Sequence, residues 1–309
     1  MNWIKKGLIY KPTGEWDFSK THAQVPFAFK LDDETLRIFF GTRDSQSSTG
    51  TTFLDVDINN PASIKYIHDK ACLSKGKPGY FDDSGTMPAW FLPDGERLLL
   101  YYTAWNKSST ASYRLSIGLA ESFDNGLTFN KLFEGPILDR NKFDAIWVGQ
   151  PCVIKEGDMW RMWYLACTKI EYIYNHPEPF YNVKYAESKN GIDWTRENIT
   201  CIDYSENTDA IGRPCVFKED NLYKMFYSYR KATDYRSDPQ KSYSMGYAES
   251  KDGIVWQRKD DEIDLTSGEN DWDSMMQEYA TTYAHNGKRY LIYNGNGFGR
   301  TGFGYAVQE

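Results

Sequence analysis

The sequence lacks long hydrophobic runs: no stretch of about 18 apolar residues occurs in its 309 residues. A helix that crosses a membrane needs about 20 such residues, so none is expected here. The lysines near the N-terminus are not followed by an apolar segment of about 7–15 residues, which a signal peptide requires. We therefore expect neither a signal peptide nor a membrane partner.

Cysteine is scarce and does not have the spacing of a disulfide framework. The five cysteines are an odd number, and none belongs to a CxxC pair. Small domains built on disulfides carry an even number of regularly spaced cysteines instead. The pattern indicates a reducing compartment, and we expect a cytoplasmic protein. Zinc-ligand spacing is also missing, so no metal ion and no other cofactor is expected.

Basic residues are fewer than acidic residues. The chain has 36 Lys and Arg residues against 43 Asp and Glu residues, which gives a formal net charge of -7. A general nucleic-acid binder needs a basic face that neutralises phosphates. The charge balance therefore argues against nucleic acid as a partner, although it is compatible with a local anion-binding site.

Aromatic residues, in contrast, are abundant. The 10 Trp, 23 Tyr and 17 Phe residues make up 16% of the chain and are spread along its whole length. This distribution excludes intrinsic disorder and indicates a folded core. The length fits one large domain or two small ones. Sustained helical periodicity is absent, which favours an all-β fold.

The chain is built from an internal repeat. The segments YAESKNGIDW and YAESKDGIVW begin at Tyr185 and Tyr247, 62 residues apart, and GLAESFDNGLTF from Gly118 resembles both. A second series lies upstream of each such segment and has nearly the same period, with spacings of 62, 63, 63 and 65 residues. Its anchors are Pro26, Pro88, Pro151, Pro214 and Tyr279. Five periods of 62 residues account for the whole chain.

Each period predicts four strands. A strand follows the anchor, a polar turn such as Pro93-Asp94-Gly95 comes next, and an aromatic-rich second strand follows. The YAES segment is the third strand, and a DG or NG turn leads to the fourth. Four antiparallel strands repeated five times radially make a five-bladed β-propeller. We expect residues 1–309 to form this single domain.

The two ends of the sequence predict how the ring closes. The last repeat stops after its third strand, at GFGYAVQE, whereas the N-terminal residues 2–6 resemble the fourth-strand segments 193–196 and 255–258. We therefore expect the N-terminal strand to be the outer strand of the last blade, because such closure removes exposed sheet edges.

Polar residues gather where the repeat predicts one common surface. The start of the first strand and the end of the second lie at the same end of a blade, so these residues from all blades meet at one mouth of the central channel. Carboxylates, guanidinium groups, amides and indoles around a concavity suit a sugar ligand. The candidates are His22, Gln24, Arg43, Asp44, Asp82, Asp83, Trp105, Asn106, Asp144, Trp147, Gln150, Asp209, Arg213, Tyr229, Arg230, Glu278 and Asn294.

The layout and several motifs resemble the five-bladed propellers of glycoside hydrolase families 43, 62, 32, 68 and 130. Within that group, the sequence is most similar to glycosidase-like proteins encoded in bacterial surface-polysaccharide clusters. The resemblance implies a carbohydrate substrate and extends over all blades. The matching stretches are GTRD (41–44), FDDSGTMPAW (81–90), YRLSIGLAES (113–122), GPILDR (135–140), WRMWYL (160–165), RPCVFK (213–218) and NGNGFGRTGFG (294–304).

One departure from these families affects the choice of catalytic residues. Families 43 and 32 place a catalytic aspartate at the entry of the first strand of blade one, where this chain has His22 and Gln24. Their usual carboxylates of blades three and four would fall near Gln150 and Arg213. The catalytic residues therefore cannot be transferred from the families position by position.

We expect Asp83 and Glu278 to form the carboxylate pair. Asp83 lies beside Asp82, and two adjacent like charges can raise the pKa of one carboxyl group, as a general acid requires. The alternative is that one carboxylate only caps the turn. For Glu278 the alternative is a salt bridge to Arg213. Asp44 is the third catalytic candidate.

The other candidates are expected to bind the substrate. Arg43, Arg213 and Arg230 are suited to clamp the carboxylate or phosphate of an acidic sugar. For Arg43 and Arg230 the alternative is an ion pair between blades. His22 is a possible acid or base near neutral pH, and its alternative is a hydrogen-bonded structural role. Trp105 and Trp147 are candidate stacking platforms, and their alternative is a place in the core between blades.

These residues predict a carbohydrate-active enzyme, most simply a glycoside hydrolase that acts on a bacterial glycan. A phosphorylase or glycosyltransferase is an alternative in the same class, because the arginines could hold phosphate. A non-catalytic glycan-binding or assembly protein is the alternative from another class, and the missing blade-one aspartate favours it.

Overall fold

Residues 1–206, 208–265 and 271–308 are described by the computed structural model, and nearly all of their regular structure is β-strand. This confirms the prediction of an all-β fold. The strands form one four-stranded and two eight-stranded sheets. A short 3₁₀ helix, η1 (Asp260–Glu262), and one turn of helix, α1 (Asn296–Gly299), accompany them. No helix in the described ranges is long and apolar enough to cross a membrane.

The first eight-stranded sheet consists of two antiparallel groups. They meet at a single parallel residue pair, Thr49 with Gly85. The first group contains β2 (Thr21–Lys30), β3 (Thr35–Arg43), β4 (Thr49–Asp57) and β5 (Ile64–Ile67). The second group contains β6 (Gly85–Asp94), β7 (Arg97–Lys107), β8 (Tyr113–Ser122) and β9 (Asn130–Lys131).

The second eight-stranded sheet divides in the same way, at the parallel pair of Tyr181 with Ala210. The third group contains β10 (Val148–Glu156), β11 (Met159–Ile173), β12 (His176–Ser188) and β13 (Thr200–Ile202). The fourth group contains β14 (Ala210–Glu219), β15 (Leu222–Arg230), β16 (Ser244–Ser250) and β17 (Gln257–Arg258).

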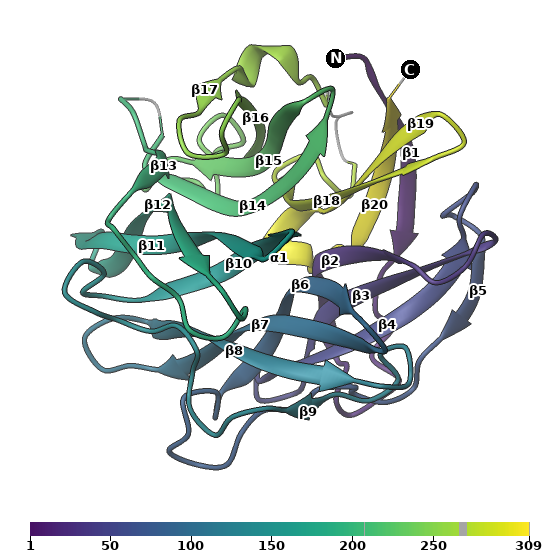
Figure 1. The fold of residues 1–309 in the computed structure, drawn as a ribbon, viewed down its shortest axis with the longest axis horizontal. Coiled ribbons are helices and arrows are strands. Elements are labelled where there is room, and N and C mark those ends of the chain that lie inside the picture. The colour runs from purple at the N-terminus through teal and green to yellow at the C-terminus, as the bar shows by residue number, and fades with distance from the viewer. Residues whose placement is uncertain (207, 266–270, 309) are drawn as a thin grey trace.

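The N-terminal strand joins the last group, as the sequence predicts. The strand order is β1-β20-β19-β18, and it contains β1 (Trp3–Tyr10), β18 (Glu278–His285), β19 (Lys288–Asn294) and β20 (Phe303–Gln308). Trp3 is buried and packs edge-on against Phe226, with the ring centroids 5.7 Å apart. Figure 1 shows both termini at the same side of the molecule, where β1 and β20 run side by side.

The repeated YAES segments hold neighbouring groups together. The hydroxyl groups of Ser188 and Ser250 accept hydrogen bonds from the backbone N–H of Gly191 and Gly253, at 2.9 and 2.8 Å. These glycines have φ of 72° and 78°, a conformation that side chains disfavour. The carbonyl of Gly253 also accepts a hydrogen bond from the indole of Trp163, in the neighbouring group, at 2.7 Å. The repeated residues thus form both a local turn and the contact between this turn and the neighbouring group.

The first strand of every group lies near the middle of the molecule. Figure 1 shows β2, β6, β10, β14 and β18 around the centre, with the later strands of each group towards the periphery. Apolar side chains fill the spaces between groups, as where Phe39 and Phe91 stack with centroids 4.0 Å apart. Tyr10 in β1 packs against Phe40 in β3, at 5.3 Å, and so joins the last group to the first. The central strands bring the candidate residues close to one another.

Candidate functional site

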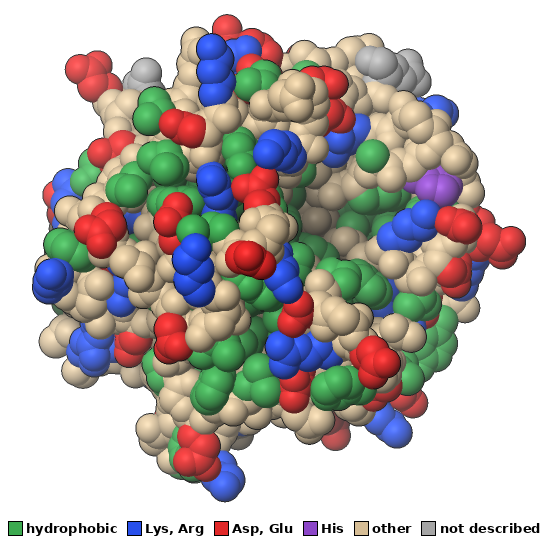
Figure 2. All heavy atoms as spheres, in the orientation of Figure 1, with side chains coloured by type: hydrophobic (Ala, Val, Ile, Leu, Met, Phe, Trp, Pro, Cys, Tyr) green, Lys and Arg blue, Asp and Glu red, His purple; other side chains and the backbone are tan. Residues whose placement is uncertain are grey.

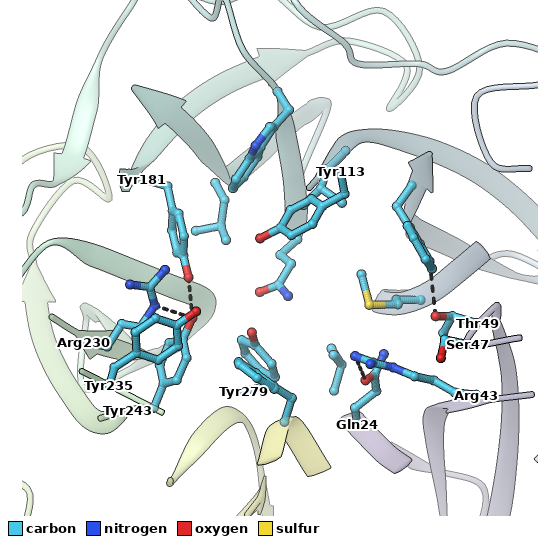
Figure 3. Close-up of a pocket in the computed structure, with 18 of the residues that line it drawn as sticks. Gln24, Arg43, Ser47, Thr49, Tyr113, Tyr181, Arg230, Tyr235, Tyr243 and Tyr279 are labelled. Carbon is cyan, nitrogen blue, oxygen red and sulfur yellow. Dashed lines mark hydrogen bonds between the residues drawn. The ribbon is translucent and has the colours of Figure 1, made fainter. Parts of the chain in front are cut away.

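A cavity of about 300 Å³ lies at the centre of the molecule, where the first strands begin. Six of the residues selected from the sequence line it, and Figure 3 shows this pocket in close-up. These six are Gln24, Arg43, Trp105, Trp147, Gln150 and Arg230. Its other residues are Val25, Ser47, Thr49, Met87, Tyr113, Leu115, Leu165, Tyr181, Tyr235, Arg236, Tyr243, Tyr279 and Phe298.

Backbone irregularities at the strand entries shape the pocket wall. Val25, Gln150 and Tyr279 have positive φ values of 53°, 44° and 58°, and the ladder of each first strand shifts register there. Such a bulge turns a side chain away from the regular alternation. Each freed N–H is bonded to a side chain of an adjacent group. The acceptors are Asn294 Oδ1, Thr103 Oγ1 and Ser228 Oγ, at 2.9, 2.8 and 2.9 Å.

Arg43 presents a partly unsatisfied guanidinium to the pocket. One of its Nη atoms donates to Gln24 Oε1 at 3.0 Å, whereas its buried Nε has no hydrogen-bond partner among the described residues. No carboxylate in the described part of the chain forms a salt bridge with it. Burial lowers the pKa of Arg43 from its usual value near 12.5, but arginine still carries its charge at neutral pH. The group can therefore donate to a ligand.

Arg230 lies on the other side of the pocket, within a cage of tyrosines (Figure 3). Its guanidinium carbon is 3.9 Å from the ring centroid of Tyr235, and its Nε donates to the Tyr243 hydroxyl at 3.1 Å. Its two Nη atoms donate to the backbone carbonyls of Lys231 and Pro179, at 2.8 and 3.3 Å, which leaves one N–H of each Nη for a ligand. Burial alone would lower the pKa of Arg230, but the hydroxyl groups around it, Tyr181 first, hold that pKa well above its usual value. The charge is thus retained although only 2% of the residue is exposed.

Tyrosine hydroxyls supply most of the remaining polar groups. Those of Tyr181 and Tyr243 are hydrogen-bonded to each other, and Figure 3 shows those of Tyr113 and Tyr279 directed towards the middle of the pocket. Burial raises the pKa of Tyr243 to about 12 and that of Tyr181 and Tyr279 well above the usual value. These phenols stay protonated at neutral pH and can donate hydrogen bonds.

The pocket is positively charged within an acidic protein. Three arginines line it, and none of its lining residues in the described ranges is Asp or Glu. The charge of Arg236 is offset by Glu178, with which it pairs, but Arg43 and Arg230 have no such partner in the part of the chain that the structure describes. Figure 2 shows cationic and anionic side chains mixed over the face in view, so the composition of the pocket is distinctive. It suits an anionic ligand with ring faces and hydroxyl groups.

Glu278 is completely buried and does not line the pocket. Burial raises its pKa to about 8, against the opposing effect of the nearby Asn294 amide and of the charges of Arg230 and Arg43, so the carboxyl group is mostly protonated at neutral pH. Neither carboxyl oxygen has a hydrogen-bond partner among the described residues. The following residue, Tyr279, does line the pocket.

Asp83 lies outside the pocket lining and caps a turn. Its carboxylate accepts hydrogen bonds from Asn106 Nδ2 at 2.7 Å, from the Gly79 N–H at 3.1 Å and from Ser84 Oγ at 3.0 Å. Burial alone would raise the pKa of Asp83, but these donors lower it below its usual value. The expected raised pKa is therefore wrong for Asp83, because three donors stabilise the charged form.

Asp82 and Asp144 are also buried away from the pocket, where each holds a tyrosine and a cation. Asp82 accepts from the Tyr102 hydroxyl at 3.2 Å and pairs with Lys131 at 2.5 Å. Asp144 makes equivalent contacts one period later, with Tyr164 at 2.9 Å and with two cations. These are Lys184 at 2.8 Å and Arg196 at 2.9 Å. The repetition of the arrangement marks it as structural.

Arg213 binds backbone carbonyls at the centre of the fold and does not line the pocket. Its guanidinium donates to the backbone carbonyls of Pro26, Tyr279 and Ala89, which belong to β2, β18 and β6. The residue is 0% exposed, and burial lowers its pKa to about 10. Its predicted role as an anion clamp is wrong, because its donors serve three central strands. It also leaves Glu278 without the salt bridge that the sequence suggested.

His22 is unsuited to acid–base work near neutral pH. It is 9% exposed, and burial together with the nearby Arg43 and Arg300 lowers its pKa to about 3. The imidazole is therefore neutral at physiological pH, and its Nδ1 is hydrogen-bonded to Thr21 Oγ1 at 2.8 Å. The burial and this hydrogen bond favour the alternative, a structural role for His22.

The remaining candidates support the backbone or lie outside the pocket lining. Asp44 accepts from the N–H groups of residues 46 and 48 in its own turn, and Asp209 accepts from the N–H of Ala232. Asn106 holds Asp83, Asn294 holds the N–H of Val25, and Tyr229 is not among the lining residues.

Several pocket residues escaped the sequence analysis because they belong to the third strands. Tyr113 and Tyr181 lie in β8 and β12, and Tyr243 directly precedes β16. A third strand starts where the second one ends, so its first residues reach the same end of the group. The signal was present in the sequence, since Tyr181 and Tyr243 are 62 residues apart. Tyr235, Arg236 and Phe298 come from connecting segments, for which the repeat makes no prediction.

No group of three or more His, Cys, Asp and Glu residues suited to hold a metal ion occurs within the described ranges.

Solved structures share the fold. The structure of a BT0996 complex with RGII has a TM-score of 0.74 and 18% identity, over 98% of this protein and 90% of that one. A glycoside hydrolase matches with a TM-score of 0.75 and 18% identity, over the same shares of the two proteins. A thermostable family-43 glycoside hydrolase has a TM-score of 0.68 and 15% identity, over 97% of this protein and 91% of that one. The protein thus has the fold of these glycosidases.

Protein-family models give no match to the sequence. Two proteins of Mycobacterium tuberculosis, the uncharacterised proteins MT1551 and Rv1502, are each 33% identical to this chain over 312 residues, which covers the whole of both chains. The chain belongs to the family of these two mycobacterial proteins.

Proposed function

We propose that this protein binds an acidic carbohydrate in the central pocket and acts on it as a glycosidase-like enzyme. The observation that carries the proposal is the pair of arginines on opposite sides of the pocket, Arg43 and Arg230, without an acidic partner among the described residues (Figure 3). Two uncompensated charges in a partly buried cavity favour an anion that lies between them. A carboxylate or a phosphate on a sugar supplies that charge.

The rest of the pocket suits the sugar itself. Trp105 contributes a partly exposed indole ring, and the hydroxyls of Tyr113 and Tyr279 face the centre. Trp147 is only 2% exposed and packs against Tyr113 and Tyr181, so it belongs to the core behind the pocket wall. Aromatic faces stack on pyranose rings, and protonated phenols can bind their hydroxyl groups. A volume of about 300 Å³ accommodates a single sugar residue. The fold shared with glycosidases supports the same class of ligand.

For the enzymatic reaction, Glu278 is the carboxyl group that stays a candidate. It is mostly protonated at neutral pH, which is the form that a general acid requires, and its neighbour Tyr279 lines the pocket. A general acid must reach the leaving oxygen, so this proposal requires the wall at Tyr279 to move and expose Glu278. Asp83 and Asp44 do not line the pocket, so they would not reach a bound sugar directly. We propose that they stabilise the turns in which they lie.

The second candidate function is non-catalytic binding of an acidic glycan, or its assembly. It is favoured by the lack of Asp and Glu among the described pocket-lining residues. Most glycoside hydrolases need two carboxyl groups beside the scissile bond. A phosphorylase or transferase is the third candidate, and turnover that depends on phosphate would distinguish it.

We further propose that the five antiparallel groups are the blades of one closed propeller domain over residues 1–309. Contacts between the first and last groups support closure, among them the packing of Tyr10 against Phe40. A bacterial glycan in the cytoplasm is the proposed setting, because all five cysteines are unpaired and buried.

Calorimetric titration tests the binding proposal. The panel contains galacturonate, glucuronate, N-acetylneuraminate and glucose 1-phosphate, with neutral glucose and galactose for comparison. We expect at least one acidic sugar to bind, and Arg43→Met to weaken its binding at least about tenfold, which corresponds to loss of one charge-assisted contact. Arg97→Met is the matched control, because Arg97 pairs with Asp94 and Glu121 outside the pocket. Binding of neutral sugars with equal affinity, or no effect of Arg43→Met, would contradict the proposal.

Turnover is tested separately with aryl glycosides of the sugars that bind. Loss of hydrolysis in Glu278→Gln, with binding retained, would support the enzyme. Binding without turnover across the series would favour the non-catalytic function.

A further inference from the structure

A second hollow of about 240 Å³ adjoins the central pocket. Tyr113 lines both cavities, so the two meet at this residue. The second hollow is open and combines the hydroxyl groups of Ser108 and Thr110 with apolar surface from Ile146 and Ile170. A ligand longer than one sugar could therefore pass from the pocket over Tyr113 into this hollow.

Like the central pocket, the second hollow is lined by positively charged residues. Arg114 and Arg140 line it, and its lining in the described ranges includes neither Asp nor Glu. Arg114 forms no salt bridge with another described residue. Arg140 has Asp139 at 3.9 Å, but both side chains are about 40% exposed, and so loose a surface pair contributes little. Two adjacent hollows thus present uncompensated arginines, in a protein whose net charge is -7.

An extended hairpin borders the second hollow. Strands β11 and β12 continue their pairing outward to Ile173 and His176, beyond the length of the other hairpins. The hydroxyl of Tyr172 in this extension donates to the carbonyl of Thr110 at 3.3 Å, which fastens the hairpin to the edge of the hollow. Tyr172 and Tyr174 are nevertheless 65% and 81% exposed. Exposed aromatic rings at a fixed rim are a surface on which sugar rings stack.

We propose that the second hollow is a subsite for a second acidic residue, so that the ligand is an oligosaccharide with an acidic group on at least two of its sugars. This inference rests on the proposed function of the central pocket. Arg43 and Arg230 hold the first acidic group, Arg114 and Arg140 hold the second, and Tyr113 lies between the two sugars. A neutral or singly charged oligosaccharide leaves the second pair of arginines unused.

The test compares oligomers of increasing length. Monomers, dimers and trimers of galacturonic acid, of glucuronic acid and of N-acetylneuraminic acid are titrated into the protein, into the double variant Arg114→Ala/Arg140→Ala and into Arg97→Ala as the control. For a series whose monomer binds, we expect the dimer or trimer to bind at least about tenfold more tightly than the monomer. The double variant should lose that gain and bind the monomer as before. Both arginines are solvent-exposed, so the variant should keep its fold, which circular dichroism checks.

The outcomes separate the two proposals. Longer oligomers that bind no more tightly than the monomer, or a gain that survives in the double variant, would overturn the second subsite and leave the central pocket in place. Failure of every acidic sugar in all three series would overturn the proposed function, and the second subsite with it.

Discussion

The side-chain oxygen of Asn294 accepts a hydrogen bond from the backbone N–H of Val25 at 2.9 Å, although the two residues are 269 positions apart. Asn294 ends β19 in the last group, and Val25 lies at the bulge of β2 in the first. Both residues are buried, so water does not satisfy the N–H if the asparagine is removed. This contact joins the two ends of the repeat and also shapes the pocket, which Val25 lines.

Asn294→Ala should therefore destabilise the protein. Leaving a buried N–H without a partner costs roughly 1–3 kcal/mol. Urea unfolding monitored by tryptophan fluorescence measures the change. Asn130→Ala in the exposed edge strand β9 is the control and should change the free energy of unfolding by less than about 0.5 kcal/mol. Equal stability of the two variants would show that the contact does not hold the first and last groups together.

Arg213→Met should lower stability more strongly. The substitution removes three hydrogen bonds to the central strands and leaves three carbonyls buried without them, at a cost on the order of 3 kcal/mol or more. Chemical denaturation provides the measurement, with Arg97→Met as the control on the molecular surface. A variant that keeps the parental stability but loses ligand binding would restore the anion clamp that the sequence suggested.

Glu278 should make stability fall as pH rises. Its pKa is about 8 in the folded protein and about 4.5 for an ordinary glutamate, so the folded state binds the proton more tightly. The protonated group contributes its full stability below about pH 4.5, and this stability is lost as pH rises towards and through 8. The loss amounts to a few kcal/mol.

Glu278→Gln mimics the protonated acid and should remove this pH dependence. Unfolding free energies at pH 5 and pH 9 should differ by less in the variant than in the parent, and the variant should be the more stable protein at pH 9. Glu197→Gln, at an exposed position, should behave like the parent. A parental protein whose stability rises between pH 5 and 9 would contradict the burial of an uncharged Glu278.

Asp83→Asn should affect a turn and leave the pocket unchanged. The carboxylate accepts three hydrogen bonds in the segment 79–106, and an amide replaces them incompletely, at a cost of about 1 kcal/mol. Affinity for an acidic sugar should stay within about twofold of the parent. Asp158→Asn, in an exposed turn, is the control for stability. Loss of turnover in Asp83→Asn, with stability intact, would return this residue to the catalytic candidates.

The fold was predictable because its main signals are local. A polar turn between two apolar runs determines a hairpin, and the serine and glycine of the YAES segment determine the next turn through a bond between near neighbours. Each repeat contains the same kinds of turn and strand residues, so the period alone predicts antiparallel groups of four strands. The similarity of the N-terminal segment to fourth strands likewise predicted that it would pair with the last group.

The candidate site was only partly predictable. Their positions at the strand ends predicted a common surface for Arg43, Trp105, Gln150 and Arg230, and all four line the pocket. It could not separate them from Arg213, which the repeat places beside Gln150 in an adjacent group but which the structure uses to join central strands.

The sequence by itself determined an all-β chain of repeated antiparallel strands whose polar ends meet, because hairpins and turns depend on residues a few positions apart. Only the tertiary structure decided which polar side chains face the pocket. At Val25, Gln150 and Tyr279 a bulge redirects the chain, and each bulge is held by a side chain from a different group. Contacts between groups, and the burial that shifts the pKa of His22 and Glu278, exist only after the groups have packed together.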